Sequence, residues 1–176
     1  VQQHPNYDSW WKARNARNAI HNLQPAMLWV GGLFDAEDLW GAWNCYKTTK
    51  QKSPNSSNRL VMGPWSHGQW ASNNGNYLGN IRFASNTSEW YQQNIEVPFF
   101  NYYLKNKGTA DHIAGATIFF TGQNQWQNFE SWPPKHIEEK TLFIASEGKL
   151  SFKESRSEKF APRGSREKSY SEYISD

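Results

Sequence analysis

The first half of the chain alternates between amphipathic and continuously apolar segments. Residues 7–21 place apolar side chains every three to four positions, and Asp8 or Ser9 can cap the first turn, which predicts a short helix. Pro25 ends that pattern, and residues 26–32, AMLWVGG, form an apolar run closed by two glycines. Such a run is typical of a strand buried on both faces in a parallel sheet.

A helix and a second strand are predicted next. Residues 38–50 repeat apolar side chains at helical spacing, with Asp38 placed to cap the first turn and basic residues near the end. Residues 59–63, RLVMG, form another short apolar run. Strand, helix and strand in this order indicate a βαβ unit, so we expect an α/β fold in which the two strands are parallel neighbours.

Two further segments belong to this predicted α/β domain. Residues 64–85 are rich in Gly, Asn and Ser, and a loop of this length in a compact domain is usually functional. Residues 88–107 are amphipathic, with Pro98 kinking or restarting a helix and Gly108 ending it. We expect this helix to cover the sheet.

Beyond Gly115 the chain changes to short β-type segments separated by turn residues. These segments are ATIFFTG (116–122), TLFIASEGKLSF (141–152) and KSYSEYIS (168–175). We therefore predict two domains, an α/β domain over residues 1–110 and a β domain over residues 111–176. For the serine-rich end of the chain we expect an exposed loop with an edge strand, or disorder.

Composition and charge exclude several function classes. The chain has 37% hydrophobic residues and a net charge of +3, and its cations are scattered, which argues against a nucleic-acid partner. No apolar run approaches the ~18 residues of a membrane span, so we expect no membrane partner. Cys45 is the single cysteine, and the histidines lack metal-ligand spacing, so we expect no metal and no cofactor.

Polar side chains that carry chemistry follow the two predicted strands. Asp35 lies three residues after the first strand, and His67 lies four residues after the second. The carboxyl ends of parallel strands meet at one edge of a sheet, and neighbouring strands are ~4.8 Å apart, so the two side chains are expected to touch. A carboxylate that holds one imidazole nitrogen leaves the other free to act as a general base in a hydrolase.

Four motifs of this chain resemble segments of the CocE/NonD hydrolases, the group that includes the X-Pro dipeptidyl-peptidases of family S15. The resemblance is strongest to the α-amino acid ester hydrolases and the glutaryl-7-ACA acylase-like proteins. In family order, the motifs are GLFDAEDLWGA (32–42), VMGPWSHGQW (61–70), FFNYYLKNKG (99–108) and IFFTGQNQWQNFESWPP (118–134).

The resemblance implies the C-terminal part of an α/β-hydrolase core, followed by the start of a β jelly-roll domain. In that family the Asp of G-x-[FWY]-D and the His of G-P-W-x-H belong to a catalytic triad, which gives those roles to Asp35 and His67. The third member, a Ser on a Gly-x-Ser-x-Gly turn, is absent from the 176 residues. We therefore expect a serine hydrolase whose nucleophile lies upstream, and we expect this chain alone to be inactive.

The resemblance also suggests a substrate class, namely α-amino acyl or X-Pro dipeptidyl esters and amides. Asp8 resembles one of the carboxylates that receive the substrate ammonium group in the α-amino acid ester hydrolases. Tyr7 and Trp65 are candidates for apolar walls around an acyl group. The expected partner is a small ester or amide or a short peptide, and a periplasmic or secreted location follows from the resemblance alone. The sequence leaves open whether the protein forms a homo-oligomer.

Other polar residues near the motifs have simpler explanations. Glu37 and Asp38 fit the first turn of a helix, where carboxylates stabilise the helix dipole by about 0.3–1 kcal/mol each. Ser66 is next to His67 in the sequence, but adjacent loop residues rarely point at each other, so we do not expect it to be the nucleophile. Cys45, on a predicted helix, fits a buried and inert thiol.

A binding module without catalysis is the alternative function. The second half of the chain is rich in tryptophan, and Trp126 and Trp132 are candidates for stacking on the sugar rings of a carbohydrate. A saturable shift of the intrinsic fluorescence on titration with oligosaccharides would favour this alternative.

Overall fold

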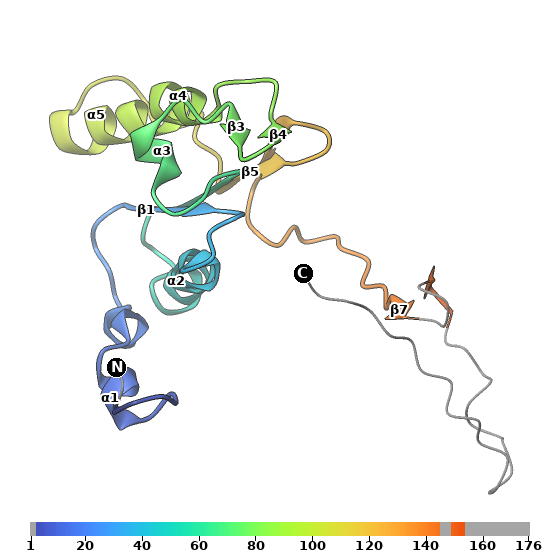
Figure 1. Cartoon of the computed structure of the whole chain (residues 1–176). Coiled ribbons are helices and arrows are strands. Elements are labelled where there is room, and N and C mark those ends of the chain that lie inside the picture. Colours follow the sequence, from blue (N-terminus) through green and yellow to red (C-terminus); the bar gives the residue numbers. More distant parts are fainter. Residues whose placement is uncertain (1–2, 145–148, 154–176) are drawn as a thin grey trace, which may run out of the picture. The chain divides into compact units, whose positions relative to one another are not determined.

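The computed structural model describes residues 3–144 and 149–153 of the 176-residue chain (Figure 1). The chain divides into two compact units, residues 1–135 and residues 136–176. The first unit contains the α/β fold and both predicted catalytic residues. In the second unit, the described residues include two short antiparallel strands, β7 (Phe143–Ile144) and β8 (Leu150–Ser151).

A four-stranded sheet forms the centre of the first unit. Its strands are β1 (Met27–Gly32), β2 (Asn58–Gly63), β5 (Ala116–Phe120) and β6 (Gln125–Phe129), in that spatial order. β1, β2 and β5 run parallel, and β6 pairs antiparallel with β5. The predicted strands at 26–32 and 59–63 and their parallel pairing are confirmed.

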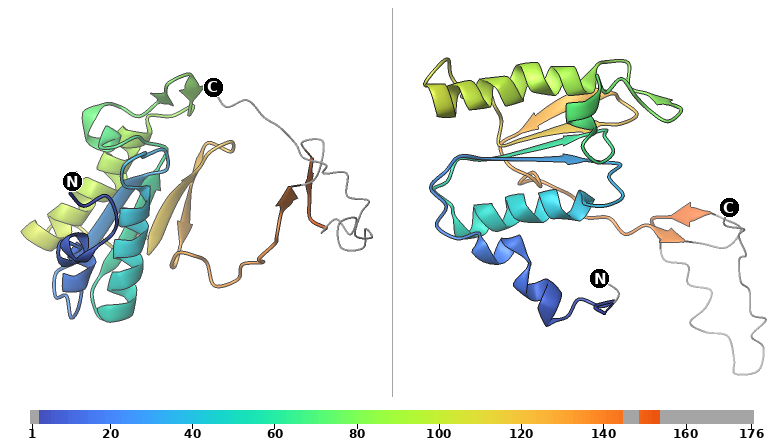
Figure 2. Two further views of the ribbon diagram at one scale, coloured as in Figure 1. Left: turned by 60° about the horizontal axis from the view of Figure 1, so that its bottom comes forward. Right: turned by 60° about the vertical axis from the view of Figure 1, so that its left-hand side comes forward.

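Helices cover both faces of this sheet (Figure 2). α2 (Leu39–Lys52) connects β1 to β2 and lies on one face. On the other face lie α4 (Thr87–Tyr91), the π-helical turn η2 (Gln92–Glu96) and α5 (Val97–Lys105), which follow one another without a break. The helix predicted over 88–107 is therefore confirmed.

Pro98 lies in the first turn of α5, where the long helix changes from π-helical to α-helical hydrogen bonding. Proline has no N–H to donate to the preceding turn. Just before it, the Val97 N–H bonds to the Gln92 carbonyl, five residues earlier, in the π-helical turn. Asn106 adopts a left-handed conformation and ends α5, two residues before the predicted stop at Gly108.

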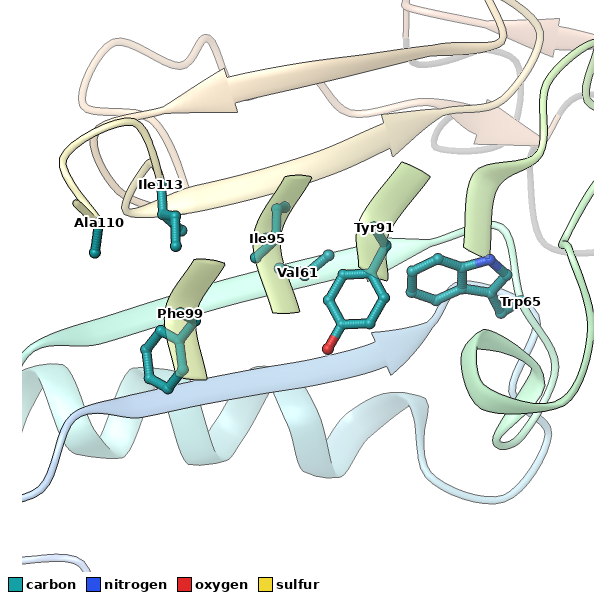
Figure 3. Packing of buried hydrophobic residues seen from close by; sticks show 7 residues of the cluster. All are labelled: Val61, Trp65, Tyr91, Ile95, Phe99, Ala110 and Ile113. Atoms are coloured by element: carbon teal, nitrogen blue, oxygen red, sulfur yellow. The ribbon is translucent and has the colours of Figure 1, made fainter. Parts of the chain in front are cut away.

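The core follows the alternation of side chains along β2. Leu60 and Met62 pack on the α2 side, together with Tyr46 and Ile118. Val61 points to the opposite face, where Tyr91, Ile95 and Phe99 of the long helix cover it (Figure 3). β2 is thus buried on both faces. β1 is only partly buried over Met27–Val30, because among the described strands it has β2 as its single neighbour.

Two predicted segments differ from the structure. The helix predicted over 7–21 forms only as α1 (Ser9–Ala13) and a 3-10 turn, η1 (Ala16–Ala19), each with an N-cap side chain of its own. The residues 64–85, predicted as a loop, contain α3 (Gln69–Ser72) and a hairpin of β3 (Tyr77–Leu78) and β4 (Ile81–Arg82).

The domain boundary predicted between residues 110 and 111 also differs from the division observed. β5 pairs with β2, and β6 pairs with β5, so both strands extend the α/β sheet. The apolar pattern of β5 is the same whether the strand belongs to the α/β sheet or to a separate β domain, so the sequence pattern alone did not place it. The segment predicted at 168–175 lies outside the described residues. Within the described part of the chain, no helix is long and apolar enough to cross a membrane.

Candidate active site

Asp35 lies in the tight turn that leaves β1. Its side chain is 3% exposed, and its Oδ1 accepts hydrogen bonds from the backbone N–H groups of Glu37 (2.8 Å) and Asp38 (2.9 Å). An Asp that binds backbone donors two and three residues ahead is the usual stabiliser of such a turn. These bonds occupy one carboxylate oxygen and direct the other toward the next strand.

His67 lies in the turn that leaves β2 and contacts Asp35 directly. Its Nδ1 is 2.9 Å from Asp35 Oδ2. Because an ionised carboxylate only accepts, Nδ1 is the donor of this bond, and Nε2 is left as the basic nitrogen. The His67 side chain is 58% exposed, and among the described residues no hydrogen bond engages Nε2. The predicted meeting of the two side chains is confirmed.

The contact between Asp35 and His67 shifts the pKa of both side chains. Burial raises the pKa of the Asp35 carboxyl, but the N–H groups of Asp38 and Glu37 and the His67 ring together hold that pKa below its usual value. The hydrogen bond and the charge of Asp35 raise the pKa of His67, and the nearby carboxylate of Glu37 raises it further. Asp35 therefore stays ionised, and His67 becomes a stronger base than a free imidazole.

The two turns are joined by backbone hydrogen bonds. Leu33 N–H donates to the Gly63 carbonyl (2.8 Å), and Phe34 N–H donates to the Trp65 carbonyl (3.0 Å). Gly32 makes this approach possible, since a Cβ there would collide with the Trp65 carbonyl oxygen. The ladder between β1 and β2 thus continues past the strand ends and sets the separation of Asp35 from His67.

Trp65 was predicted to form an apolar wall around an acyl group, which requires an accessible ring, but the structure buries it. Its indole is fully buried beside Tyr91 (Figure 3), and it also packs on Trp126. Its Nε1 donates to Thr87 Oγ1 (2.9 Å) at the start of α4. A side chain enclosed in this way cannot line a substrate surface, so Trp65 anchors the turn instead. Sequence alone did not distinguish a buried ring from an exposed one.

Tyr7 and Asp8 lie at the start of α1. Asp8 caps this helix by accepting from Trp10 N–H, and it also bonds His4 Nδ1 at 2.7 Å. Tyr7 is exposed, and its hydroxyl accepts from Asn15. Within the described residues no hydrogen bond or ion pair links either side chain to Asp35 or His67. Their proposed substrate roles remain predictions.

Comparison with known proteins supports the motif analysis. Residues 1–69 match the family model of the X-Pro dipeptidyl-peptidase (S15 family). Cocaine esterase of Rhodococcus sp. (strain MB1 Bresler) is 26% identical over an alignment of 139 residues that covers 76% of this chain and 22% of that protein.

Two solved structures resemble the fold. An aminopeptidase from a marine sediment archaeon, Thaumarchaeota archaeon, is 37% identical with a TM-score of 0.78, over 86% of this chain and 25% of that one. An α-amino acid ester hydrolase is 30% identical with a TM-score of 0.76, over 86% of this chain and 26% of that one. These matches support the resemblance of the chain to the CocE/NonD hydrolases. The chain spans about a quarter of the length of these relatives.

The other polar residues considered near the Asp35–His67 pair have structural roles. Ser66 donates from Oγ to Gln69 Oε1 (3.3 Å) and makes no hydrogen bond to His67. Asp38 occupies the N-cap position of α2, but its side chain makes no capping bond, and its N–H serves Asp35 instead. Sequence analysis did not single out Gln69, because a Gln in a polar segment carries no signal of burial.

The tryptophans of the alternative binding function are engaged in packing. The Trp126 ring stacks on Trp90, with ring centroids 4.7 Å apart, and its Nε1 is buried. The Trp132 ring packs against Trp43 and Phe129. Both rings are half-buried and take part in aromatic packing, so nothing in the described structure favours a carbohydrate site. Within residues 3–144 and 149–153, no cluster of three or more His, Cys, Asp or Glu side chains has a geometry that suits a metal ion.

Proposed function

We propose that this chain supplies the general base and its orienting carboxylate to a serine hydrolase that cleaves esters or amides through an acyl-enzyme. The observation that carries the proposal is the 2.9 Å bond between Asp35 Oδ2 and His67 Nδ1, with the imidazole exposed on its other side. Similarity to known proteins supports the same class, since the proteins that match include an esterase, an ester hydrolase and peptidases.

In the proposed mechanism, His67 Nε2 removes the proton from a serine hydroxyl as the serine oxygen attacks the substrate carbonyl carbon. Asp35 holds Nδ1–H and stabilises the imidazolium that results. The imidazolium then gives its proton to the leaving alcohol or amine as the carbonyl–heteroatom bond breaks. In the second half-reaction His67 takes a proton from water, which attacks the acyl-serine, and returns it to the serine oxygen.

The 176 residues contain no Gly-x-Ser-x-Gly motif that could provide the nucleophile of this reaction. We therefore propose that the serine comes from a part of the protein outside this sequence. For the substrate we propose an α-amino acyl or X-Pro dipeptidyl ester or amide, in keeping with the relatives. Asp8 and Tyr7 stay as candidate substrate contacts in this proposal.

The test compares His67→Ala with His112→Ala in the full-length protein that carries these residues. His112 is an exposed histidine whose ring bonds the Asn94 carbonyl, outside the candidate site, so it controls for loss of an imidazole. We expect His67→Ala to lower kcat on an activated ester by at least about 10³-fold and His112→Ala to leave it unchanged. Undiminished hydrolysis by His67→Ala would refute the proposal.

A further inference from the structure

Gln69 is a buried polar residue two positions after His67. It is 5% exposed and is the first residue of α3. Its Oε1 accepts from the Ser66 N–H (3.0 Å) and from the Ser66 hydroxyl (3.3 Å). Its Nε2 donates to the Tyr77 carbonyl (2.8 Å) in the β3–β4 hairpin. The amide therefore links the backbone just before His67 to a separate element of the fold.

The backbone groups of Gln69 also form hydrogen bonds. Its carbonyl accepts from the Ser88 hydroxyl (3.4 Å) of α4, and its N–H donates to the Ser66 carbonyl (3.2 Å). Ser66 and Gln69 thus form a closed turn around His67. Gly68, which has a φ of +70°, allows the chain to reverse inside this turn.

The histidine ring itself has little support from packing. Its side chain is more than half exposed, and its one hydrogen bond among the described residues goes to Asp35. The position of the ring therefore depends on the backbone to either side. Before His67, the buried Trp65 fixes the turn through Thr87. After it, Gln69 performs the same task through Ser66 and Tyr77.

An amide suits this position because it accepts and donates at once. Oε1 faces an N–H group, and Nε2 faces a carbonyl oxygen. A carboxylate would keep the first contact but place negative charge against the Tyr77 carbonyl. An apolar side chain of the same length would leave the Ser66 N–H and the Tyr77 carbonyl without this partner in a partly buried setting.

We propose that Gln69 is a positioning residue that holds the His67 turn in register with Asp35. This inference rests on the proposed function, because it concerns the geometry of the same pair. Gln69 touches neither His67 nor Asp35 through its side chain in any described contact, so it acts through the backbone of Ser66. Loss of the amide is expected to widen the range of ring positions and to reduce the time that Nδ1 spends against the carboxylate.

The matched variants are Gln69→Met and Gln92→Met. Both replace a glutamine whose Nε2 donates to a backbone carbonyl at 2.8 Å, but Gln92 bonds the Trp70 carbonyl of α3, and among the described residues no hydrogen bond links its side chain to Ser66 or His67. In the full-length protein we expect kcat to fall at least tenfold further for Gln69→Met than for Gln92→Met, with KM changed by less than threefold for both. A smaller difference in kcat, or a loss confined to KM, would overturn the inference.

Gln69→Glu is the second variant, in case the methionine variant does not fold. It retains an acceptor for the Ser66 N–H and loses the donor to the Tyr77 carbonyl. We expect kcat again to fall at least tenfold further than for Gln92→Met, and a smaller loss in this folded variant would contradict the role of the donor. Near-ultraviolet circular dichroism identifies which variants retain the packed tryptophans.

A second readout separates this inference from the proposed function. Proton NMR of the 176-residue chain follows the titration of the His67 ring, which faces the carboxylates of Asp35, Glu37 and Asp38. We expect the His67 midpoint to fall toward 6.5 in Gln69→Met and to stay unchanged in Gln92→Met. An unchanged midpoint in Gln69→Met overturns the inference even where hydrolysis is intact. Absence of hydrolysis in the full-length wild type defeats the proposed function and leaves this titration interpretable.

Discussion

At the residue scale, the two oxygens of Asp35 have separate partners. Oδ1 binds the backbone of its own turn, and Oδ2 binds His67. A carboxylate fixed by two backbone donors cannot rotate away when the imidazole moves. The orientation of His67 is therefore set by a group that is itself rigid, which is the condition for an efficient general base.

The substitution Asp35→Asn tests this orienting role. An amide at this position can present its NH2 group to Nδ1, which favours the wrong imidazole tautomer. We expect kcat to fall by about 10⁴-fold in the full-length protein, as it does when the orienting carboxylate of a serine protease triad is replaced. Steady-state kinetics on an activated ester measures the loss, and a decrease of less than tenfold would contradict the assigned role.

The pH dependence follows from the raised pKa of His67. Only the neutral imidazole accepts a proton, so activity is lost as the pH falls through the His67 pKa. Because Asp35 raises that pKa, the acid limb of kcat/KM is expected to have its midpoint above 6.5. Neutralising Glu37 as Glu37→Gln is expected to move the midpoint to lower pH. A midpoint that does not respond to Glu37→Gln would show that this carboxylate is too well screened to matter.

At the element scale, the turns after β1 and β2 behave as one unit. Gly32 and Gly63 remove the Cβ atoms that would otherwise collide with Trp65. We expect Gly32→Ala to destabilise the fold by about 1–3 kcal/mol and to displace the His67 turn. Urea denaturation gives the free energy of unfolding. Gly79→Ala, in the β3–β4 turn, meets no neighbouring atom and bears only the strain of its positive φ, a conformation that Gly32 does not have, so it separates backbone strain from collision.

Trp65 has an energetic role that the tryptophan content of the chain does not reveal. Trp65→Ala removes a fully buried indole and its bond to Thr87, so we expect a loss of about 3–5 kcal/mol in the free energy of unfolding. Trp40 is 62% exposed and is contacted by the Arg17 guanidinium, so Trp40→Ala is expected to cost no more than about 1 kcal/mol. Equal losses in the two variants would contradict the assignment of Trp65 to the core.

The elements that sequence predicted best are those with an unambiguous local pattern. β1, α2 and β2 each have a clear period or apolar run, and their order alone places Asp35 beside His67. β6 was not predicted because its sequence, QWQNF, is mostly polar and resembles a loop. Its strand conformation depends on pairing with β5, which is a tertiary contact. Trp65 and Gln69 were misplaced or missed because burial in a turn leaves no periodic signal.

At the scale of the whole molecule, the described α/β unit places one acid–base pair at the carboxyl end of adjoining parallel strands. This is where open α/β sheets place their reactive groups. The family resemblance and the topology lead to the same two residues by independent routes. What neither route supplies from these 176 residues is a nucleophile of the Gly-x-Ser-x-Gly type.

Catalysis is therefore expected to require more of the protein than the present chain. The isolated 176-residue chain is expected to be unlabelled by a fluorophosphonate probe, whereas the full-length protein is expected to be labelled on a serine. Gel fluorescence with mass spectrometry of the labelled peptide makes the comparison. Labelling of Ser66 in the isolated chain would show that the nucleophile has been assigned to the wrong part of the protein.

The most direct test of the central claim is a double-mutant cycle on kcat in the full-length protein. It compares Asp35→Asn, His67→Ala and the double variant with the wild type. If Asp35 works only through His67, adding Asp35→Asn to His67→Ala causes no further loss, because residues that act as a unit are not additive. If the two losses multiply in the double variant, the carboxylate and the imidazole act independently, and Asp35 is not the orienting partner of His67.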